Sequence, residues 1–314
     1  RDLHSFPTRR SSDLQLAIIR AFMPARLRLP SAAIIIIDGR LVRQTIEKGF
    51  DFMQFCSLYS GSSGNCLYVA HGRTRLLVDA GLSGKKIEQG LVSADVLPTE
   101  LDGILITHEH RDHIHGAGVL SRRYNLPIYA NAATWEAMAP ELGKIDGDNV
   151  RFFVTGVPFD IGDLQIDSFP ISHDAAEPVG FAIDSGNHSL GIATDTGVMT
   201  DTILGSLKGR ELVVLESNHD AAMLETGPYP YPLKRRIAGE HGHLSNDTAG
   251  DTAVTLAESG VKQIVLAHLS HENNLPILAY QTSKGFFEAS GISERDTRLA
   301  VARRHERSSI FDVC

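Results

Sequence analysis

The stretch Thr107-His108-Glu109-His110-Arg111-Asp112-His113 follows directly after the apolar run Gly103-Ile104-Leu105-Ile106. An apolar run that ends in a cluster of imidazoles predicts a buried strand with metal ligands at its tip. In an extended chain, side chains two residues apart point the same way, so His108 and His110 can bind one metal ion. Asp112 and His113 then face a neighbouring position. A carboxylate with three imidazoles suits zinc, manganese or iron, and two adjacent half-sites are typical of a two-metal hydrolase.

This pattern, His108-x-His110-x-Asp112-His113 with Gly116 and Gly118 behind it, resembles the signature of the metallo-β-lactamase fold superfamily of metal hydrolases. The resemblance runs from about Met53 to the C-terminus. More narrowly, three stretches are similar to the YycJ/WalJ-like branch: Phe55-Cys56-Ser57-Leu58-Tyr59-Ser60-Gly61-Ser62-Ser63-Gly64-Asn65-Cys66, Gly242-His243-Leu244-Ser245-Asn246 and Leu266-Ala267-His268-Leu269-Ser270. That branch implies a bacterial phosphodiesterase associated with 5′-to-3′ exonuclease action on DNA. For the fold, the superfamily implies an α/β (α+β) architecture, a four-layer αββα sandwich.

The later ligand candidates also end apolar strands. His173, Asp195 and His268 follow Leu164–Ile171, Ser189–Thr194 and Gln263–Ala267. The resemblance implies that His108, His110 and His173 hold one divalent ion and that Asp112, His113 and His268 hold a second, with Asp195 between the two ions. Zn²⁺ and Mn²⁺ both accept this mixture of nitrogen and oxygen ligands. Asp79, at the end of the apolar run Leu76-Leu77-Val78, is expected to orient a ligand rather than to bind metal.

The residues expected to act on substrate lie around His243. By resemblance to tRNase Z and the YycJ-like enzymes, His243 lies over the scissile phosphate and protonates the leaving oxygen. Asp112 is the second catalytic candidate, beside a water that the metal ions activate. His219 either touches substrate or supports a ligand. The basic run Lys234-Arg235-Arg236 either binds phosphate or is a solvated helix face, and the link Gly61–Asn65, with Ser62 and Asn65, is either a turn or an anion-binding nest.

Composition limits the choice of partner and compartment. The 314 residues allow one large domain or two small ones, and 42% of them are apolar, which is enough for a sizeable core. A net charge of −8 argues against a broad basic surface, so nucleic-acid contact has to be local. Three cysteines favour a reducing, cytoplasmic compartment over a disulfide framework. The resemblance, and not the composition, implies a nucleic acid as substrate, DNA rather than RNA. We expect no membrane partner, and a chain that is compatible with a homodimer.

Residues 1–52 differ from the rest of the chain. Arg1 to Leu14 is polar and rich in Ser and Arg, and the apolar run Ala33–Ile37 is too short to span a bilayer. Because the resemblance begins at Met53, we expect residues 1–52 to be a non-native or disordered extension without function. No internal repeat or low-complexity linker divides residues 53–314, which we expect to form one hydrolase domain.

The regular elements expected outside the strands already named are helices and further strands. Asp112–Tyr124 is expected to be one helix that starts at the site, and Gly227–Pro232 an aromatic loop. The other expected helices are Leu82–Val92, Ala132–Ala139, a helix up to Glu258 and Leu275–Ser290; the other expected strands are Met53–Ser60, Cys66–Ala70, Arg75–Asp79, Pro127–Ala130, Val150–Gly156, Val179–Ile183, Leu212–Glu216 and Leu299–Ala302.

Two other functions fit part of the pattern. A hydrolase of small thioesters, lactams or lactones would use the same ligands, and the acidic net charge favours it, whereas the Gly242–Asn246 motif opposes it. A metal-dependent oxidoreductase or sensor would need a di-iron centre and usually an electron-carrier domain, of which residues 53–314 show no trace.

Overall fold

The computed structural model describes residues 32–37, 40–45 and 50–313. The chain divides into two units, Arg1–Glu47 and Lys48–Cys314. In the first unit, β1 (Ala32–Ile37) and β2 (Arg40–Thr45) pair antiparallel, with Ala32 opposite Thr45. The rest of the predicted extension, apart from the first residues of β3, lies outside the described residues. Whether residues 1–52 are native therefore stays a prediction.

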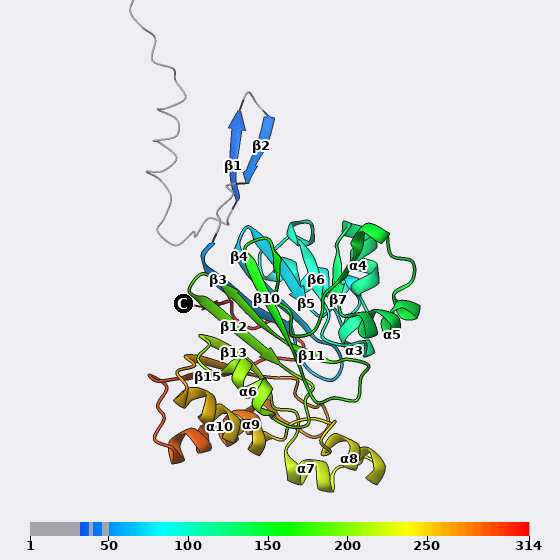
Figure 1. The fold of residues 1–314 in the computed structure, drawn as a ribbon. Coiled ribbons are helices and arrows are strands. Elements are labelled where there is room, and N and C mark those ends of the chain that lie inside the picture. Colours follow the sequence, from blue (N-terminus) through cyan, green and yellow to red (C-terminus); the bar gives the residue numbers. More distant parts are fainter. Residues whose placement is uncertain (1–31, 38–39, 46–49, 314) are drawn as a thin grey trace, which may run out of the picture. The chain divides into compact units, whose positions relative to one another are not determined.

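Within residues 50–313, the strands form two seven-stranded sheets (Figure 1). The first sheet has the order β16-β3-β4-β5-β6-β7-β8, and the second has the order β15-β14-β13-β12-β11-β10-β9. The strands of the first sheet are β3 (Phe50–Tyr59), β4 (Cys66–Gly72), β5 (Thr74–Val78), β6 (Gly103–Leu105), β7 (Ile128–Ala130), β8 (Val150–Phe152) and β16 (Phe311–Val313). Those of the second are β9 (Phe159–Ile161), β10 (Leu164–Pro170), β11 (Val179–Ser185), β12 (His188–Ala193), β13 (Leu212–Glu216), β14 (Gln263–Ala267) and β15 (Arg298–Val301).

Helices cover the outer face of each sheet (Figure 1). Side chains of α2, α4 and α5 share one apolar cluster with the first sheet, and side chains of α6, α9 and α10 share another with the second. A third cluster, which includes Leu76, Phe181 and Val265, lies between the sheets. The predicted four-layer αββα sandwich is therefore confirmed. The helices are α2 (Gly84–Ser93), α3 (Arg111–Ile114), α4 (Ala117–Tyr124), α5 (Ala132–Leu142), α6 (Asp201–Leu207), α7 (Ala221–Thr226), α8 (Tyr231–Ile237), α9 (Asn246–Glu258) and α10 (Pro276–Ala289), with short 3₁₀ turns at Pro98–Glu100 and Gly147–Asn149.

Strand burial follows strand direction. In β13, which pairs parallel on both sides, all five residues are buried, so its sequence is a continuous apolar run up to Glu216. In β10, which pairs antiparallel on both sides, buried and more exposed residues alternate along Leu164–Ile166. Cys56 and Cys66 are buried free thiols, as expected for core residues, and Cys314 lies outside the described residues. Among the described helices, none has the length and apolarity that crossing a membrane requires.

The helix predicted over Asp112–Tyr124 is wrong as a single element. The structure has the four-residue helix α3 and then α4, which begins only after Gly116. The Gly116 amide donates to the Ala80 carbonyl, and a Cβ on Gly116 would lie 2.2 Å from the Leu82 carbonyl oxygen. This close contact with the turn after β5 interrupts the helix, so two short helices stand where one was expected.

Other differences concern short elements. The structure adds α6, α7, β9 and β16 to the predicted elements, and α8 begins at Tyr231, inside the stretch expected to be an aromatic loop. The arrangement that matters for function is the direction of the parallel strands. β5 and β6 in one sheet and β12, β13 and β14 in the other run parallel within their sheets. The residues that follow their carboxyl ends therefore gather at one edge of each sheet, where ligands bind in α/β folds.

Candidate metal centre

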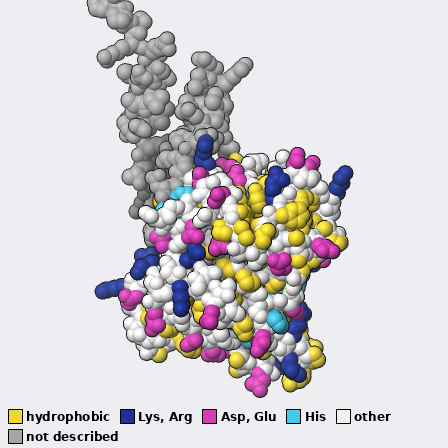
Figure 2. All heavy atoms as spheres, in the orientation of Figure 1, with side chains coloured by type: hydrophobic (Ala, Val, Ile, Leu, Met, Phe, Trp, Pro, Cys, Tyr) yellow, Lys and Arg dark blue, Asp and Glu magenta, His cyan; other side chains and the backbone are white. Residues whose placement is uncertain are grey.

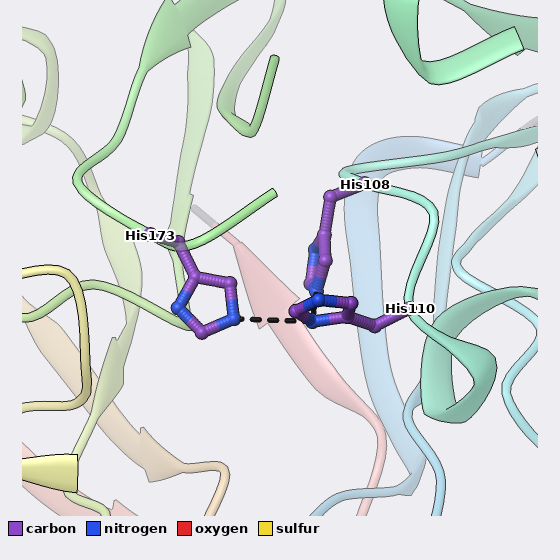
Figure 3. Close-up of side chains that lie close together, drawn as sticks. All are labelled: His108, His110 and His173. Atoms are coloured by element: carbon purple, nitrogen blue, oxygen red, sulfur yellow. Dashed lines mark hydrogen bonds between the residues drawn. The ribbon is translucent and has the colours of Figure 1, made fainter. Parts of the chain in front are cut away.

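Three imidazoles form the first group, and Figure 3 shows them converging from two loops. His108 and His110 follow β6, and His173 follows β10. The His110 Nδ1 atom lies 3.1 Å from His108 Nε2 and 3.2 Å from His173 Nε2. Ring nitrogens of all three residues lie within 4.8 Å of one another, close enough to share one ion. The expectation that His108 and His110 point the same way agrees with this geometry.

A second group lies beside the first. Asp112 and His113 belong to α3, and His268 directly follows β14. The Asp112 Oδ2 atom lies 3.7 Å from both His113 Nε2 and His268 Nε2. His113 and His268 are buried, whereas Asp112 is partly exposed. These three residues can therefore hold a second ion.

Asp195 lies between the two groups. Its Oδ1 atom is 4.0 Å from His173 Nε2 and 3.3 Å from His268 Nδ1, and its Oδ2 atom is 3.3 Å from His113 Nε2. The structure thus brings together all seven residues that the sequence predicted as ligands. Their roles as ligands stay a prediction.

Four imidazoles have their Nδ1 atoms held from behind, which fixes the ring orientation. Asp79 Oδ2 lies 2.7 Å from His113 Nδ1, and the Thr107 hydroxyl lies 3.0 Å from His108 Nδ1. The Gly242 carbonyl lies 3.2 Å from His173 Nδ1, and Glu216 Oε1 lies 2.9 Å from His268 Nδ1. In each ring this leaves Nε2 for the centre of the site. Asp79 also accepts hydrogen bonds from the Thr107 amide and hydroxyl, so it occupies the orienting position that the sequence predicted.

The donor set fits divalent cations. His268 Nε2 and Asp195 Oδ2 are buried and have no hydrogen-bond partner among the described residues. Burial alone would lower the pKa of His113, but the carboxylates of Asp195, Asp79 and Asp112 raise it to about 9. Burial and neighbouring imidazoles hold the pKa of His108 well below its usual value, which keeps it in the neutral form that binds metal. The carboxylates at this place favour a positive charge, and the neutral imidazoles offer nitrogen lone pairs. A divalent metal ion supplies the charge and accepts the lone pairs.

A buried carboxylate, Glu216, connects this centre with His243. Glu216 is fully buried at the end of β13. Its Oε1 atom lies 2.8 Å from His243 Nδ1, and its Oε2 atom accepts hydrogen bonds from the Thr196 and Leu244 amides. Burial would raise the pKa of Glu216, but the charge and hydrogen bond of His243, with those of His268, hold it well below its usual range. Burial would likewise lower the pKa of His243, but Glu216 and Asp195 raise it.

The centre opens into a cavity of about 370 Å³. Its walls come from the Gly61–Asn65 link, both metal groups, the loop after His173 and the α7–α8 region. The lining residues are Ser62, His110, Arg111, Asp112, His173, Asp174, Asp195, Tyr229, Leu233, Arg236, Ile237, Gly242, His243 and His268. His243 is thus at the surface of the cavity, with its Nδ1 atom turned toward Glu216 and its Nε2 atom available to a ligand.

The remaining site candidates differ in whether they line this cavity. Ser62 and Arg236 line it, and Arg236 also pairs with Asp174. Lys234 and Arg235 are not among the lining residues, and the Lys234 ammonium donates to the Glu225 carbonyl. Of the predicted basic run, only Arg236 therefore faces the site.

Asn65 and His219 lie behind the cavity wall. The Asn65 amide nitrogen lies 3.1 Å from His113 Nε2, and its Oδ1 atom accepts from the Gly61 amide. Together with the hydrogen bond from the Gly64 amide to the Gly61 carbonyl, this makes the link a turn. His219 is buried, burial lowers its pKa, and its backbone pairs with Ser245. It therefore supports the His243 loop and does not line the cavity.

Comparisons with known proteins agree with this geometry. The sequence model of the family described as "Beta-lactamase superfamily domain" matches residues 74–269. The chain belongs to the β-lactamase superfamily. Within it, the chain is similar to the YycJ/WalJ-like branch, as the sequence predicted. It is 44% identical over 239 residues to "Exodeoxyribonuclease YycJ" of Bacillus anthracis, an alignment that covers 76% of this chain and 90% of that protein.

Two further comparisons place this superfamily member. It is 43% identical over 238 residues to "Exodeoxyribonuclease WalJ" of Streptococcus pneumoniae, covering 75% of this chain and 87% of that protein. The crystal structure of the metallo-β-lactamase fold protein YhfI from Bacillus subtilis superposes with a TM-score of 0.63, covering 82% of this chain and 99% of that one. Because the sequence identity to YhfI is 19%, this last likeness shows the shared fold alone.

Sequence reasoning missed several residues of this superfamily member's site. The most important is Glu216, which ends an apolar strand just as Asp79 does and so had the same signal. Thr107, which contacts Asp79 and His108 through its hydroxyl, begins the Thr107–His113 motif but is not a usual metal ligand. Asn218, whose amide donates to the His268 carbonyl, gave no signal in the sequence.

Proposed function

We propose that this chain is a metal-dependent phosphodiesterase that hydrolyses nucleic acid, DNA in preference to RNA, from the 5′ end. The relatives named exodeoxyribonuclease support this substrate class, since the alignments cover 90% and 87% of their lengths. The observation that carries the proposal is the His243–Glu216 pair at the cavity wall, because a held imidazole with a raised pKa is the group that a phosphodiester leaving group requires. Because Glu216 also holds the candidate metal ligand His268, its burial fits any metal hydrolase; what favours a phosphodiester over a β-lactam, thioester or lactone is the place of His243 at the cavity wall.

We infer two divalent ions, Zn²⁺ or Mn²⁺, in the two ligand groups. His108, His110 and His173 would hold one ion, Asp112, His113 and His268 the other, and Asp195 both. When bound, such ions lower the pKa of the attacking water and neutralise charge on the non-bridging phosphate oxygens.

The side chains of the cavity supply the remaining chemistry. His243 donates a proton from Nε2 to the leaving oxygen, while Glu216 accepts the hydrogen bond from Nδ1 and stabilises the protonated ring. Asp112 is partly exposed at the cavity and accepts a hydrogen bond from the attacking water, which orients it. Arg236, held by Asp174, supplies positive charge to the phosphate.

The distribution of surface charge favours a local contact with the nucleic acid over a broad one. On the face shown in Figure 2, Lys and Arg side chains are scattered among Asp and Glu side chains. Tyr229 and Arg236, which lie in the α7–α8 region and line the cavity, offer stacking and charge near the metal centre. We also propose a reducing, cytoplasmic compartment, consistent with the free thiols of Cys56 and Cys66, and a homodimer, which light scattering of the purified chain would test.

The test is hydrolysis of a 5′-phosphorylated DNA duplex and of a matched RNA by the chain loaded with Zn²⁺ or Mn²⁺. We expect nucleotides to be released from the 5′ end of DNA, faster than from RNA, and this release to be lost in Asp112→Ala and His243→Ala. The matched control is His241→Ala, because His241 lies two residues before His243 and does not line the cavity. A metal-loaded chain that leaves both nucleic acids intact but opens a thioester or lactone would refute the proposal.

A further inference from the structure

A second cavity of about 270 Å³ adjoins the metal cavity. Two short segments separate them. In the first, Ser60 lines the second cavity and Ser62 lines the metal cavity, with only Gly61 between. In the second, His268 faces the metal cavity and the next residue, Leu269, faces the second one. The two cavities therefore share two segments of their walls, Ser60–Ser62 and His268–Leu269.

The walls of the second cavity combine an apolar floor with a positive rim. Leu269 and Ala302 are buried, and Leu275 is 52% exposed at the start of α10. The half-buried Arg304 donates from Nη2 to the Leu269 carbonyl, 2.8 Å away, and lies beside Gly61. The full lining is Ser60, Leu269, Ser270, His271, Asn274, Leu275, Pro276, Ala302, Arg304 and His305. An apolar surface for a base beside a guanidinium for a phosphate matches a nucleotide.

The local charge of the chain is unusual at this place. The protein carries a net charge of −8, yet the segment 303–307 reads Arg-Arg-His-Glu-Arg. Its one carboxylate, Glu306, pairs with Arg303 and not with Arg304. The carboxylate that acts on Arg304 is Glu272, which forms its ion pair with the neighbouring His271. Arg304 therefore brings a positive charge to the rim, next to the turn that separates it from the metal centre. An acidic enzyme that acts on a polyanion needs such a local positive site for substrate binding.

We propose that this cavity binds the nucleotide adjoining the scissile phosphate. Its base lies against Leu275 and Pro276, and its phosphate contacts Arg304 and His305. This inference rests on the proposed function, because it extends the substrate of the metal cavity by one nucleotide. Because a terminal 5′-phosphate and an internal phosphate present the same chemistry, the test compares the two.

The first test removes the charge of Arg304. Arg304→Gln keeps an N–H group that can donate to the Leu269 carbonyl, and Arg303→Gln is the control, since Arg303 pairs with Glu306 and does not line the cavity. We expect Arg304→Gln to lower kcat/KM on a single-stranded oligonucleotide by about tenfold, as for loss of one charged hydrogen bond. The slope of log affinity against log salt, from fluorescence anisotropy with the metal removed, should become shallower by about 0.7. The control should change neither.

The second test places a negative charge on the floor. Leu275→Glu should weaken oligonucleotide binding by about tenfold through repulsion of phosphate. Ile277→Glu should not, because Ile277, which is 59% exposed in the first turn of α10, lies outside the cavity. The effect of Arg304→Gln is then measured on 5′-phosphorylated and 5′-hydroxyl oligonucleotides. If the substitution weakens cleavage of the 5′-phosphorylated oligonucleotide but not of the 5′-hydroxyl one, the cavity binds the terminal phosphate. If it weakens cleavage of both, the cavity binds an internal phosphate.

Hydrolysis of bis(p-nitrophenyl) phosphate, which carries one phosphate and no adjoining nucleotide, separates the two hypotheses. For these four variants it should stay within twofold of the unsubstituted chain. If Arg304→Gln and Leu275→Glu bind and cleave oligonucleotides like their controls, the second cavity is not a nucleotide site, although the phosphodiesterase proposal stands. If the unsubstituted chain cleaves no nucleic acid at all, the proposed function fails first.

Discussion

Glu216→Gln is the substitution that most directly tests how the site protonates a leaving group. The Glu216 carboxylate faces four donors: His243 Nδ1 and His268 Nδ1 at Oε1, and the Thr196 and Leu244 amides at Oε2. A glutamine presents its NH₂ group to one of these pairs. Because a backbone amide cannot become an acceptor but an imidazole can change tautomer, the NH₂ group will face the two histidines. His243 Nδ1 then becomes an acceptor, and the ring stays neutral. His268 Nδ1 becomes an acceptor as well, which places its proton on Nε2, so the metal content of this variant has to be matched to that of the unsubstituted chain before rates are compared.

The size of the effect follows from this tautomer change. Glu216 raises the pKa of His243, so its removal moves that pKa down, toward or below the ordinary value of about 6.5. A protonated histidine is needed for the reaction, so the limb on which kcat falls with rising pH should move to lower pH. At pH 8 we expect kcat/KM on DNA to fall by about 100-fold, the lower end of what a positioned general acid contributes. At pH 6 the loss should be smaller, because more of the ring is protonated there.

The assay is a pH profile of DNA hydrolysis between pH 5.5 and pH 9 at saturating metal, with metal content and circular dichroism as checks on folding. Glu211→Gln is the matched control. Glu211 immediately precedes β13, at the end of the strand opposite Glu216, and contacts His188 at 3.4 Å. Its substitution should leave the profile unchanged. If Glu216→Gln keeps kcat/KM within threefold at pH 8, or loses activity equally at every pH, Glu216 does not hold His243 in its acidic form and the reasoning is refuted.

Three further predictions concern the metal centre and its frame. Asp195→Asn should lower bound metal, measured by plasma mass spectrometry, by at least half, because Asp195 is the residue near both groups, whereas Asp167→Asn should not. The metal-free chain should lose about 3 kcal/mol of unfolding free energy between pH 6.5 and pH 9, because the pKa of His113 in the folded chain is raised to about 9 and the ring loses its proton across that window. In urea titrations, His113→Gln should make the unfolding free energy less dependent on pH. An unchanged pH dependence in this variant would contradict the prediction. Gly81→Ala should lower the free energy of unfolding by about 3 kcal/mol or more, since the added Cβ would lie 1.6 Å from the Asp112 carbonyl oxygen. The control is Gly205→Ala, whose Cβ would meet nothing within 4 Å and should stabilise α6 by about 0.5–1 kcal/mol.

The seven candidate ligands, which the structure brings together, could be proposed from the sequence because each of their signals is local. An apolar strand that ends in a His or an Asp can be recognised within about six residues, and the parallel strands bring such ends to one edge. The α3–α4 break was not predictable, because it depends on the Ala80 carbonyl, a group more than thirty residues away in the chain. The pairing of β16 with β3 is likewise a contact between the two ends of the domain. Helix α6 had a local signal, the Thr200 N-cap, that went unused.

The basic run shows a different limit of sequence reasoning. Lys234, Arg235 and Arg236 lie on one helix, where successive side chains point about 100° apart. One residue can face the cavity while its neighbours face elsewhere, and the sequence does not say which. The Asp174 carboxylate, which comes from a distant loop, settles the question by pairing with Arg236. The same reasoning explains Glu216: only the packing of two sheets decides that this strand-end carboxylate turns inward to His243.

Three site residues at strand ends have a left-handed backbone conformation. Asp79, Asp195 and His268 adopt positive φ angles of 62°, 61° and 55°, a conformation that costs a residue other than glycine about 1–3 kcal/mol. Glycine would relieve this cost, but it would supply neither a carboxylate nor an imidazole. The left-handed turn bends the chain sharply at the end of each strand, so that a side chain at the sheet edge can point into the site. Backbone strain and crowded charge therefore fall at the same positions, and a divalent cation held there would neutralise part of that charge. Metal binding should thus contribute to the stability of this fold as well as to its reaction.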